Sequence, residues 1–173
     1  MFSLDNKALL HQEDKKDAPA NDVVNTFRLD LAPLFGDGVV LVKLELRNVS
    51  GELVSDNIYW LGAKSTSYRR LNRLTTANLS ASASSSRQGN TTHLQVNLKN
   101  NGTVAALAAK LTLLGPDQMR ILPAYWSDNY VSLLPGESRA IDVEYPSGEG
   151  RGAAQVAIRG WNVAPQTIPA NLK

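Results

Sequence analysis

The feature that most constrains the fold is a series of short runs in which apolar and polar residues alternate. Residues 93–99 (HLQVNLK) alternate without exception. Such a period of two places one row of side chains inward and the other outward, as in a half-buried β-strand. Similar runs, separated by glycine and proline, cover residues 26–31, 39–46, 53–61, 74–81, 118–125, 140–145 and 155–161. Many short strands with frequent turns predict an all-β fold, an immunoglobulin-like antiparallel β-sandwich.

Two neighbouring segments need an interpretation of their own. Residues 103–114 (TVAALAAKLTLL) are rich in alanine and resemble a helix, but they follow the turn sequence Asn100-Asn101-Gly102. We therefore expect a strand that forms a hairpin with residues 93–99. Residues 80–92 (SASASSSRQGNTT) have low complexity and no evident core residue. They fit a linker or, between two strand patterns, a long hairpin loop, which we favour.

The strand candidates are distributed unequally along the chain. A boundary falls at residues 62–67 (GAKSTS), dividing the chain into domains at 1–64 and 65–173. The second part holds about seven candidates, enough for a complete sandwich of ~100 residues. The first part holds about four, too few to close two sheets. We expect one complete sandwich and one partial sandwich that lacks its opening strands, in a chain cut from something larger.

Composition and charge exclude several classes of function. The net charge of +2 with scattered basic residues argues against nucleic acid as a partner. The absence of cysteine excludes disulfides and thiolate chemistry. No apolar run approaches the ~20 residues of a membrane span, and the N-terminus lacks the order of a signal peptide. His11 and His93 stand alone, so we expect no metal site and no cofactor.

The candidate binding residues lie in the stretch YWSDNYVSLLPGESRA, and Ser-Asp-Asn also occurs at residues 55–57. One interpretation is a sugar-binding loop in which aromatic rings stack on the sugar and polar groups bond its hydroxyls. The other is structural, because Ser, Asp and Asn bond their own backbone in turns while Trp and Tyr plug the sandwich. The second copy favours a corner that is used twice. The candidates for sugar or domain-interface contact are Trp126, Ser127, Asp128, Asn129, Tyr130 and Trp161, the last also being a core candidate.

The motifs themselves resemble a known family. YWSDNYVSLLPGESRAIDVEY, followed by VAIRGWN, resembles the last immunoglobulin-like domain of family 2 glycoside hydrolases. The similar branch is that of exo-β-D-glucosaminidases and mannosylglycoprotein endo-β-mannosidases. VNLKNNGTVAALAAKLTLL also resembles this domain, and VVLVKLELRNVSGELVSDNIYWLG resembles the end of the preceding sandwich domain. The resemblance covers most of residues 23–162, is specific around 121–162 and is weak over 1–22.

The resemblance implies a multidomain parent whose catalytic glutamates lie in a (β/α)₈ barrel, for which this chain has no room. None of the glutamates present lies in a barrel motif, so we expect no catalytic residue and no activity from the chain alone. These glutamates are Glu13, Glu45, Glu52, Glu137, Glu144 and Glu149. The expected role is to brace the parent's catalytic barrel or shape its cleft, in a periplasmic or secreted enzyme. The alternatives are a carbohydrate-binding module that takes an oligosaccharide with Trp126 and Tyr130, and a simple adhesion or spacer sandwich.

Overall fold

The computed structural model describes residues 1–36, 38–148 and 153–172, which form two compact units, Met1–Arg73 and Leu74–Lys173. Asp37 of one predicted turn and residues 149–152 of another, including Glu149, lie outside the described residues. No helix among the described residues is long and apolar enough to cross a membrane.

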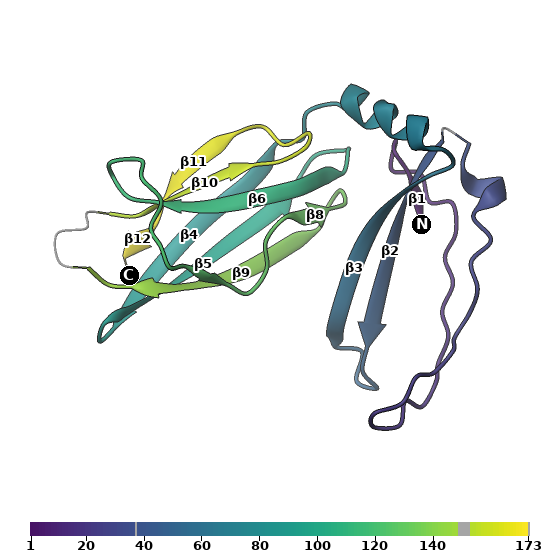
Figure 1. Cartoon of the computed structure of the whole chain (residues 1–173), viewed down its shortest axis with the longest axis horizontal. Helices are drawn as coiled ribbons and strands as arrows, with labels where there is room; N and C mark the ends of the chain where they lie inside the picture. The colour runs from purple at the N-terminus through teal and green to yellow at the C-terminus, as the bar shows by residue number, and fades with distance from the viewer. Residues whose placement is uncertain (37, 149–152, 173) are drawn as a thin grey trace. The chain divides into compact units, whose positions relative to one another are not determined.

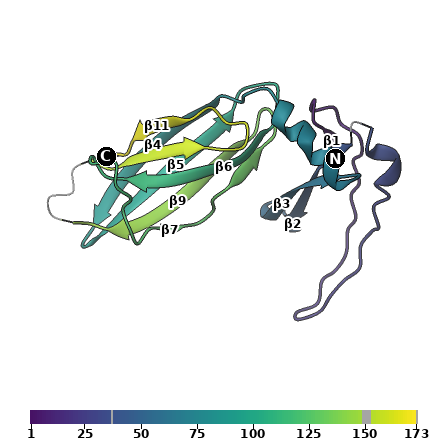
Figure 2. The ribbon, with the colours of Figure 1, turned by 45° about the horizontal axis from the view of Figure 1, so that its top comes forward.

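The second unit consists of two facing β-sheets (Figure 1). The five-stranded sheet has the order β12-β4-β5-β9-β7 and the four-stranded sheet the order β11-β10-β6-β8. All pairings are antiparallel except that of β12 with β4. The strands are β4 (Leu79–Gln88), β5 (Thr91–Asn100), β6 (Ala106–Leu114), β7 (Tyr125–Trp126), β8 (Val131–Leu133), β9 (Ser138–Pro146), β10 (Gln155–Arg159), β11 (Gln166–Pro169) and β12 (Asn171–Leu172). The predicted all-β sandwich of antiparallel sheets is confirmed, and Figure 2 shows its layers.

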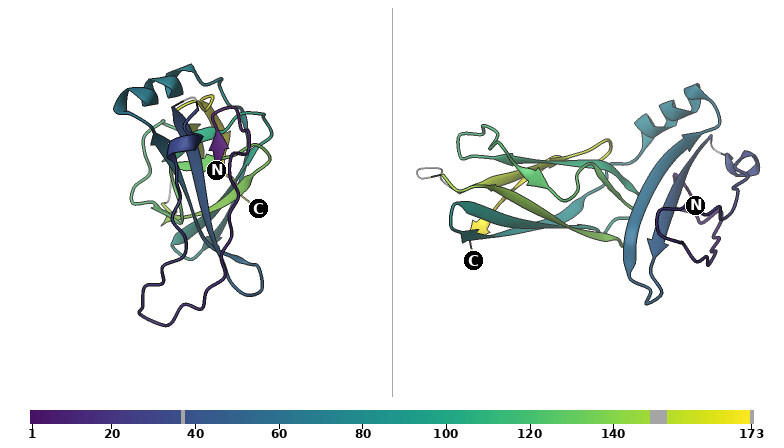
Figure 3. Two further views of the ribbon diagram at one scale, coloured as in Figure 1. Left: turned by 90° about the vertical axis from the view of Figure 1, so that its right-hand side faces the viewer. Right: turned by 60° about the horizontal axis from the view of Figure 1, so that its bottom comes forward.

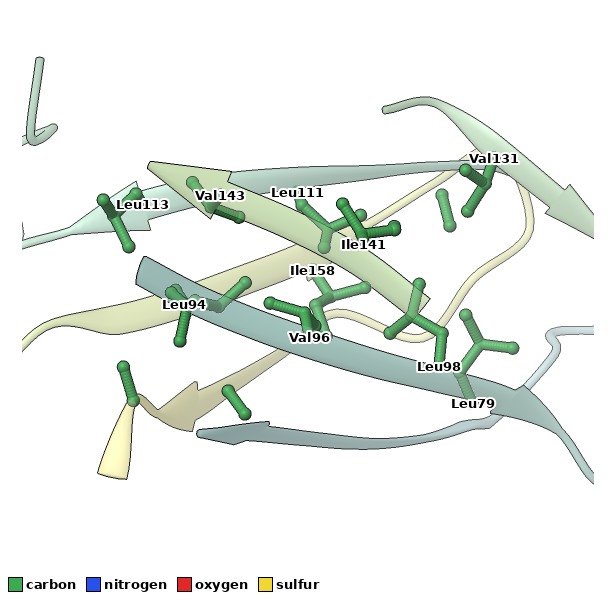
Figure 4. Close-up of a cluster of buried hydrophobic side chains, with 14 of the residues drawn as sticks. Leu79, Leu94, Val96, Leu98, Leu111, Leu113, Val131, Ile141, Val143 and Ile158 are labelled. Atoms are coloured by element: carbon green, nitrogen blue, oxygen red, sulfur yellow. The ribbon is translucent and has the colours of Figure 1, made fainter. Parts of the chain in front are cut away.

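The core lies between the two sheets (Figure 4). The alternation read from the sequence puts Leu94, Val96 and Leu98 of β5 inward, each almost fully buried. Leu111 of β6 and Ile158 of β10 meet them from the facing sheet. Each such aliphatic side chain stabilises the folded unit by roughly 1.5–3 kcal/mol through removal of apolar surface from water.

Strand β6 departs from regular geometry between Ala106 and Ala109, where its register with β8 shifts. Ala108 has φ +49°, a conformation that side chains other than glycine rarely adopt. The backbone N–H groups of this strand are nevertheless satisfied, because side chains replace the missing strand partners. Leu107 N–H donates to Asn162 Oδ1 at 2.9 Å and Ala108 N–H donates to Ser132 Oγ at 3.0 Å.

The predicted hairpin between residues 93–99 and 103–114 is wrong, although both segments are strands. β5 pairs with β4 and β9, whereas β6 pairs with β10 and β8 in the other sheet. The Asn100-Asn101-Gly102 sequence is therefore a crossing between sheets. The Asn100 side chain holds it by donating to the carbonyls of Val104 and Leu133 and by accepting from Gly102 N–H.

The predicted loop over residues 80–92 is also wrong. Most of it is β4, which pairs with β5 over its whole length, and Gly89–Asn90 alone form the turn. Ala83 and Ser85 point inward and are buried. Because the inward side chains are small, they differ little in hydrophobicity from the outward serines, and the alternation of a strand is hard to see in the sequence. The backbone pairing of the strand is nevertheless complete.

Three other predicted strands are wrong over most or all of their length. Residues 74–78 contribute only a bridge from Ala77 to Val163, and residues 118–124 only a bridge from Arg120 to Leu114. Pro123 cannot donate to a ladder and the side chain of Met119 is exposed, so the second run has no reason to pair. Residues 26–31 form no strand, because no neighbouring strand offers them a partner.

The first unit has a three-stranded sheet of order β1-β2-β3 (Figure 3). Two 3-10 helices accompany it, and neither was predicted from the sequence. Tyr68 in η2 fixes the end of β3, since its hydroxyl accepts from Gly62 N–H and donates to the Trp60 carbonyl. The elements are β1 (Phe2–Ser3), η1 (Ala32–Leu34), β2 (Val39–Arg47), β3 (Leu53–Gly62) and η2 (Ser65–Arg73).

The far ends of β2 and β3 are apolar yet exposed. Leu46 and Val54 are each 60% exposed, whereas residues 39–42 at the other end of β2 are buried. An edge strand with apolar side chains is a surface that further strands or a second layer would normally cover. Among the described residues, fewer apolar side chains are buried in this unit than in the second.

The Asn162 amide yields a stability prediction. Replacing Asn162 with Ala removes the acceptor for Leu107 N–H and the donors to the carbonyls of Thr75 and Ala105. We expect a loss of about 3 kcal/mol in the free energy of unfolding, because buried backbone groups lose their partners. Urea unfolding followed by tryptophan fluorescence measures it, and Asn97→Ala, at an exposed position of β5, is the control. Equal effects of the two changes would contradict this role.

The two units should also differ in protection from hydrogen exchange. Amides of β5 and β9 lie over the sandwich core and should exchange only through global unfolding of the second unit. Amides in residues 44–47 of β2 and residues 53–56 of β3 should exchange faster, because few apolar side chains are buried beneath them. Mass spectrometry or NMR of the exchanging chain measures this. Equal protection in both units would indicate a single cooperative unit instead.

Candidate functional site

The candidate stretch from Trp126 to Tyr130 joins β7 to β8 at the edge of the sandwich. Trp126 pairs with Val143 of β9, and its half-buried ring packs against the core. Ser127 extends this pairing, since its N–H donates to the Asp142 carbonyl and its Oγ accepts from Asp142 N–H at 2.9 Å. Both side chains therefore attach the segment to the five-stranded sheet.

Asn129 attaches the same segment to the other sheet. Its Oδ1 accepts from Leu111 N–H at 2.8 Å, and its Nδ2 donates to the Leu111 carbonyl at 3.1 Å. The side-chain amide thus takes the place of a peptide in a strand neighbouring β6. Asp128 accepts from Asn129 N–H and lies 3.7 Å from the Arg139 guanidinium. The polar groups of this segment are engaged in folding.

Tyr130 differs from its neighbours because its ring is 59% exposed. Its φ of +58° turns the chain from the Asn129 attachment into β8. The Lys110 ammonium lies 5.3 Å from the ring centroid, a cation–π arrangement. A hydrogen bond from Lys110, reinforced by the charges of Lys110, Arg159 and Arg120, lowers the pKa of the Tyr130 hydroxyl.

Trp161 lies on the surface, 53% exposed, so the core interpretation of this residue is wrong. Its backbone N–H donates to the Leu107 carbonyl at 2.9 Å. Gly160 before it passes so close to the carbonyls of Leu107 and Ala108 that a Cβ would lie within 3.0 Å of both. The core residue of the Gly-Trp-Asn motif is instead Asn162, which sequence reasoning did not single out.

The second Ser-Asp-Asn copy has a different position, and the expectation of a corner used twice is wrong. Residues 55–57 lie in the straight part of β3, where they pair with Leu46, Glu45 and Leu44 of β2. The chain turns earlier, around Gly51. The same triplet can extend a strand when every residue has a partner, so its turn-forming tendency is overridden by pairing.

The surface side of the four-stranded sheet brings together charged residues that the sequence analysis did not connect. Lys110 on β6 pairs with Arg159 on β10, and Arg120 bridges to Leu114 at the end of β6. We call Lys110, Arg120, Arg159 and Tyr130 the basic face. These residues are far apart in the sequence. The alternation within each strand does predict that Lys110 and Arg159 both point outward, which was the one signal that could have connected two of them.

The remaining candidates have local roles. The Glu137 carboxylate accepts from Leu134 N–H at 2.8 Å, as part of the Pro-Gly-Glu turn. His11 and His93 each lie near one exposed glutamate, at 3.1 Å and 3.4 Å. Among residues 1–36, 38–148 and 153–172, no group of three or more acidic or histidine side chains could hold a metal ion.

Two sheets of this topology around a continuous apolar core define an immunoglobulin-like β-sandwich module. Residues 57–163 match the family described as the exo-β-D-glucosaminidase immunoglobulin-fold domain. The chain belongs to this family, and the resemblance noted in its sequence is confirmed.

Several relatives agree with this assignment. An exo-β-D-glucosaminidase of Streptomyces avermitilis is 34% identical over 152 residues, covering 75% of this chain and 17% of that protein. A mannosylglycoprotein endo-β-mannosidase of Lilium longiflorum is 40% identical over 50 residues, covering 29% of this chain and 5% of that protein. The crystal structure of the Amycolatopsis orientalis exo-chitosanase CsxA matches with a TM-score of 0.71 and 30% identity, over 88% of this chain and 20% of that one. The chain thus spans about a fifth or less of the length of these relatives.

The contrast between Asn129 and Tyr130 can be tested by paired substitutions. Asn129→Ala should lower the free energy of unfolding by about 2 kcal/mol, because Leu111 loses both partners. Tyr130→Ala should cost less, since only exposed contacts with Lys110 are lost. Chemical denaturation of both variants measures the difference. The structural role of Asn129 fails if the order of the two effects is reversed.

Proposed function

We propose that this chain is the non-catalytic C-terminal β-sandwich region of a family 2 glycoside hydrolase. The parent would act on β-glucosaminide or β-mannoside linkages, and the sandwich would brace its catalytic barrel or shape the cleft beside it. The observation that carries this proposal is the use of Ser127, Asp128 and Asn129 in folding. The Asn129 amide in particular is occupied by Leu111 at both its oxygen and its nitrogen, so it is not available to bond sugar hydroxyls.

The length relation supports the same proposal. The relatives named for glycosidase activity are several times longer than this chain, which corresponds to about a fifth or less of each. Residues 1–64 would be the end of a preceding sandwich, and residues 65–173 the terminal one. The exposed Leu46 and Val54 fit this division, because strands of a larger domain would cover them.

The alternative function is a carbohydrate-binding module that uses Trp126 and Tyr130, and the exposed ring of Tyr130 is the observation in its favour. Two features weigh against it. The ring of Trp126 is half-buried against the core, so it offers little surface for stacking. Lys110 lies over Tyr130, and its positive charge would repel the protonated amines of a glucosamine oligomer.

Two assays with the purified chain test the proposal. We expect no hydrolysis of p-nitrophenyl-β-D-glucosaminide, and no binding heat with chitosan oligomers or mannosyl-N-acetylglucosamine glycans at millimolar ligand. Saturable binding with a dissociation constant in the micromolar range, abolished by Trp126→Ala or Tyr130→Ala, would overturn the proposal and establish the binding module. Ser82→Ala, on the outer side of the other sheet, is the control variant.

A further inference from the structure

The outer side of the four-stranded sheet carries charge of one sign. The described strand residues that point outward there are Lys110, Thr112 and Leu114 on β6, Ser132 on β8, Gln155, Ala157 and Arg159 on β10, and Thr167 and Pro169 on β11. Within this set of strand positions, no side chain is a carboxylate. The cations of the basic face therefore have no acid beside them in the same rows of the sheet.

The other sheet is arranged differently. On its outer side His93 lies 3.4 Å from Glu144, and Gln95 donates to Asp142 at 3.2 Å. Each of these two carboxylates therefore has a partner on the neighbouring strand. The imbalance on the four-stranded sheet is thus a property of one face, and the net charge of +2 for the whole chain does not reveal it.

Two residues of the basic face, Arg120 and Arg159, line a shallow hollow of about 500 Å³. Its floor includes the row Thr112, Ala157 and Thr167, which the strand register places side by side across β6, β10 and β11. Arg120 and Arg159 stand at its rim. Short side chains on the floor and guanidinium groups at the rim leave room for a protruding group that accepts hydrogen bonds from arginine.

Aromatic surface adjoins the cations. Tyr130 lies beneath Lys110, and the exposed Trp161 follows Arg159 by two residues. Tyrosine, tryptophan and arginine are the residue types that contribute most to protein–protein interfaces. Lysine over an aromatic ring is also held in one place, so it loses less conformational freedom when a partner binds.

We propose that the basic face docks onto a carboxylate-bearing surface of the polypeptide that makes up the rest of the longer protein. This inference rests on the proposed function and names the face of the sandwich and the chemistry of its partner. Charge complementarity selects an acidic partner, and an uncharged or cationic saccharide would leave the cations unmatched. The length of the relatives indicates where such a partner would come from, since most of each relative lies outside the part that matches this chain.

The test is titration of the ¹⁵N-labelled chain with hexa-L-glutamate, followed by NMR at about 20 mM salt. We expect saturable shifts of amides in β6 and β10. Raising the salt to about 300 mM should weaken binding, because the screening length falls from roughly 20 Å to roughly 6 Å. The double variant Lys110→Gln/Arg159→Gln should bind about tenfold more weakly, the combined loss expected of two exposed charge contacts.

A control variant removes two cations from elsewhere, Arg87→Gln/Lys99→Gln on β4 and β5, and should bind like the original chain. Thermal unfolding of both double variants verifies that they fold. The proposal is overturned if hexa-L-glutamate does not bind, if the shifts lie on the five-stranded sheet, or if both double variants weaken binding equally. Binding of a chondroitin sulfate hexasaccharide without binding of hexa-L-glutamate would overturn it in favour of an anionic saccharide.

This outcome is separable from the fate of the proposed function. If neither hexa-L-glutamate nor chitosan oligomers bind, the basic face is not a docking surface, but the proposal of a non-catalytic sandwich still stands. Saturable binding of chitosan oligomers removes the proposed function itself, whatever the glutamate titration shows.

Discussion

The second unit depends on asparagine side chains that complete the backbone hydrogen bonding of β6. This strand lies inside the four-stranded sheet, and its regular ladder is interrupted between Ala106 and Ala109. An asparagine amide carries one acceptor and two donors, so it can replace a peptide group where the neighbouring strand turns away. Asn162 does this for Leu107 and Ala105, and Asn129 does it for Leu111. Without them, buried N–H and carbonyl groups would lie unpaired beside the core, at a cost of about 1–3 kcal/mol each.

The same attachments determine what the surface can present. Asn129 fixes the loop immediately before Tyr130, and the left-handed backbone of Tyr130 directs its ring toward Lys110. Lys110 in turn stands opposite Arg159 because β6 and β10 pair in one register. The residues that resembled a sugar-binding loop are thus mostly the means by which a different surface is built. Under the proposed docking, the residue of this stretch that contacts a partner is Tyr130, together with residues distant in the sequence.

Strong alternation was sufficient to predict β5, β9 and β10, because each has large apolar side chains on one side only. β2 and β3 were also predicted, although each has a run of consecutive large apolar residues. Alternation failed for β4, where alanine and serine occupy the inward positions, and for residues 26–31, where the pattern exists but no partner strand does. It could not say which strands pair, since the Asn100-Asn101-Gly102 sequence suits a hairpin as well as a crossing between sheets. The basic face could not be predicted from local sequence patterns either, because it depends on which strands pair. Residues 110, 120 and 159 meet only through the register of three segments.

The two outer surfaces of the sandwich also differ in how their charges are balanced. In the five-stranded sheet, the carboxylates of Asp142 and Glu144 each have a partner on the next strand, so water and that neighbour suffice to stabilise them. In the four-stranded sheet, Lys110 and Arg159 repel each other across the ladder, and the ring of Tyr130 offsets only part of that repulsion. A neutral pair at these two positions would stabilise the folded sheet more than two like charges do. The like charges have an energetic advantage only when an anionic group approaches from outside, and the shallow hollow beside them lets such a group reach both arginines.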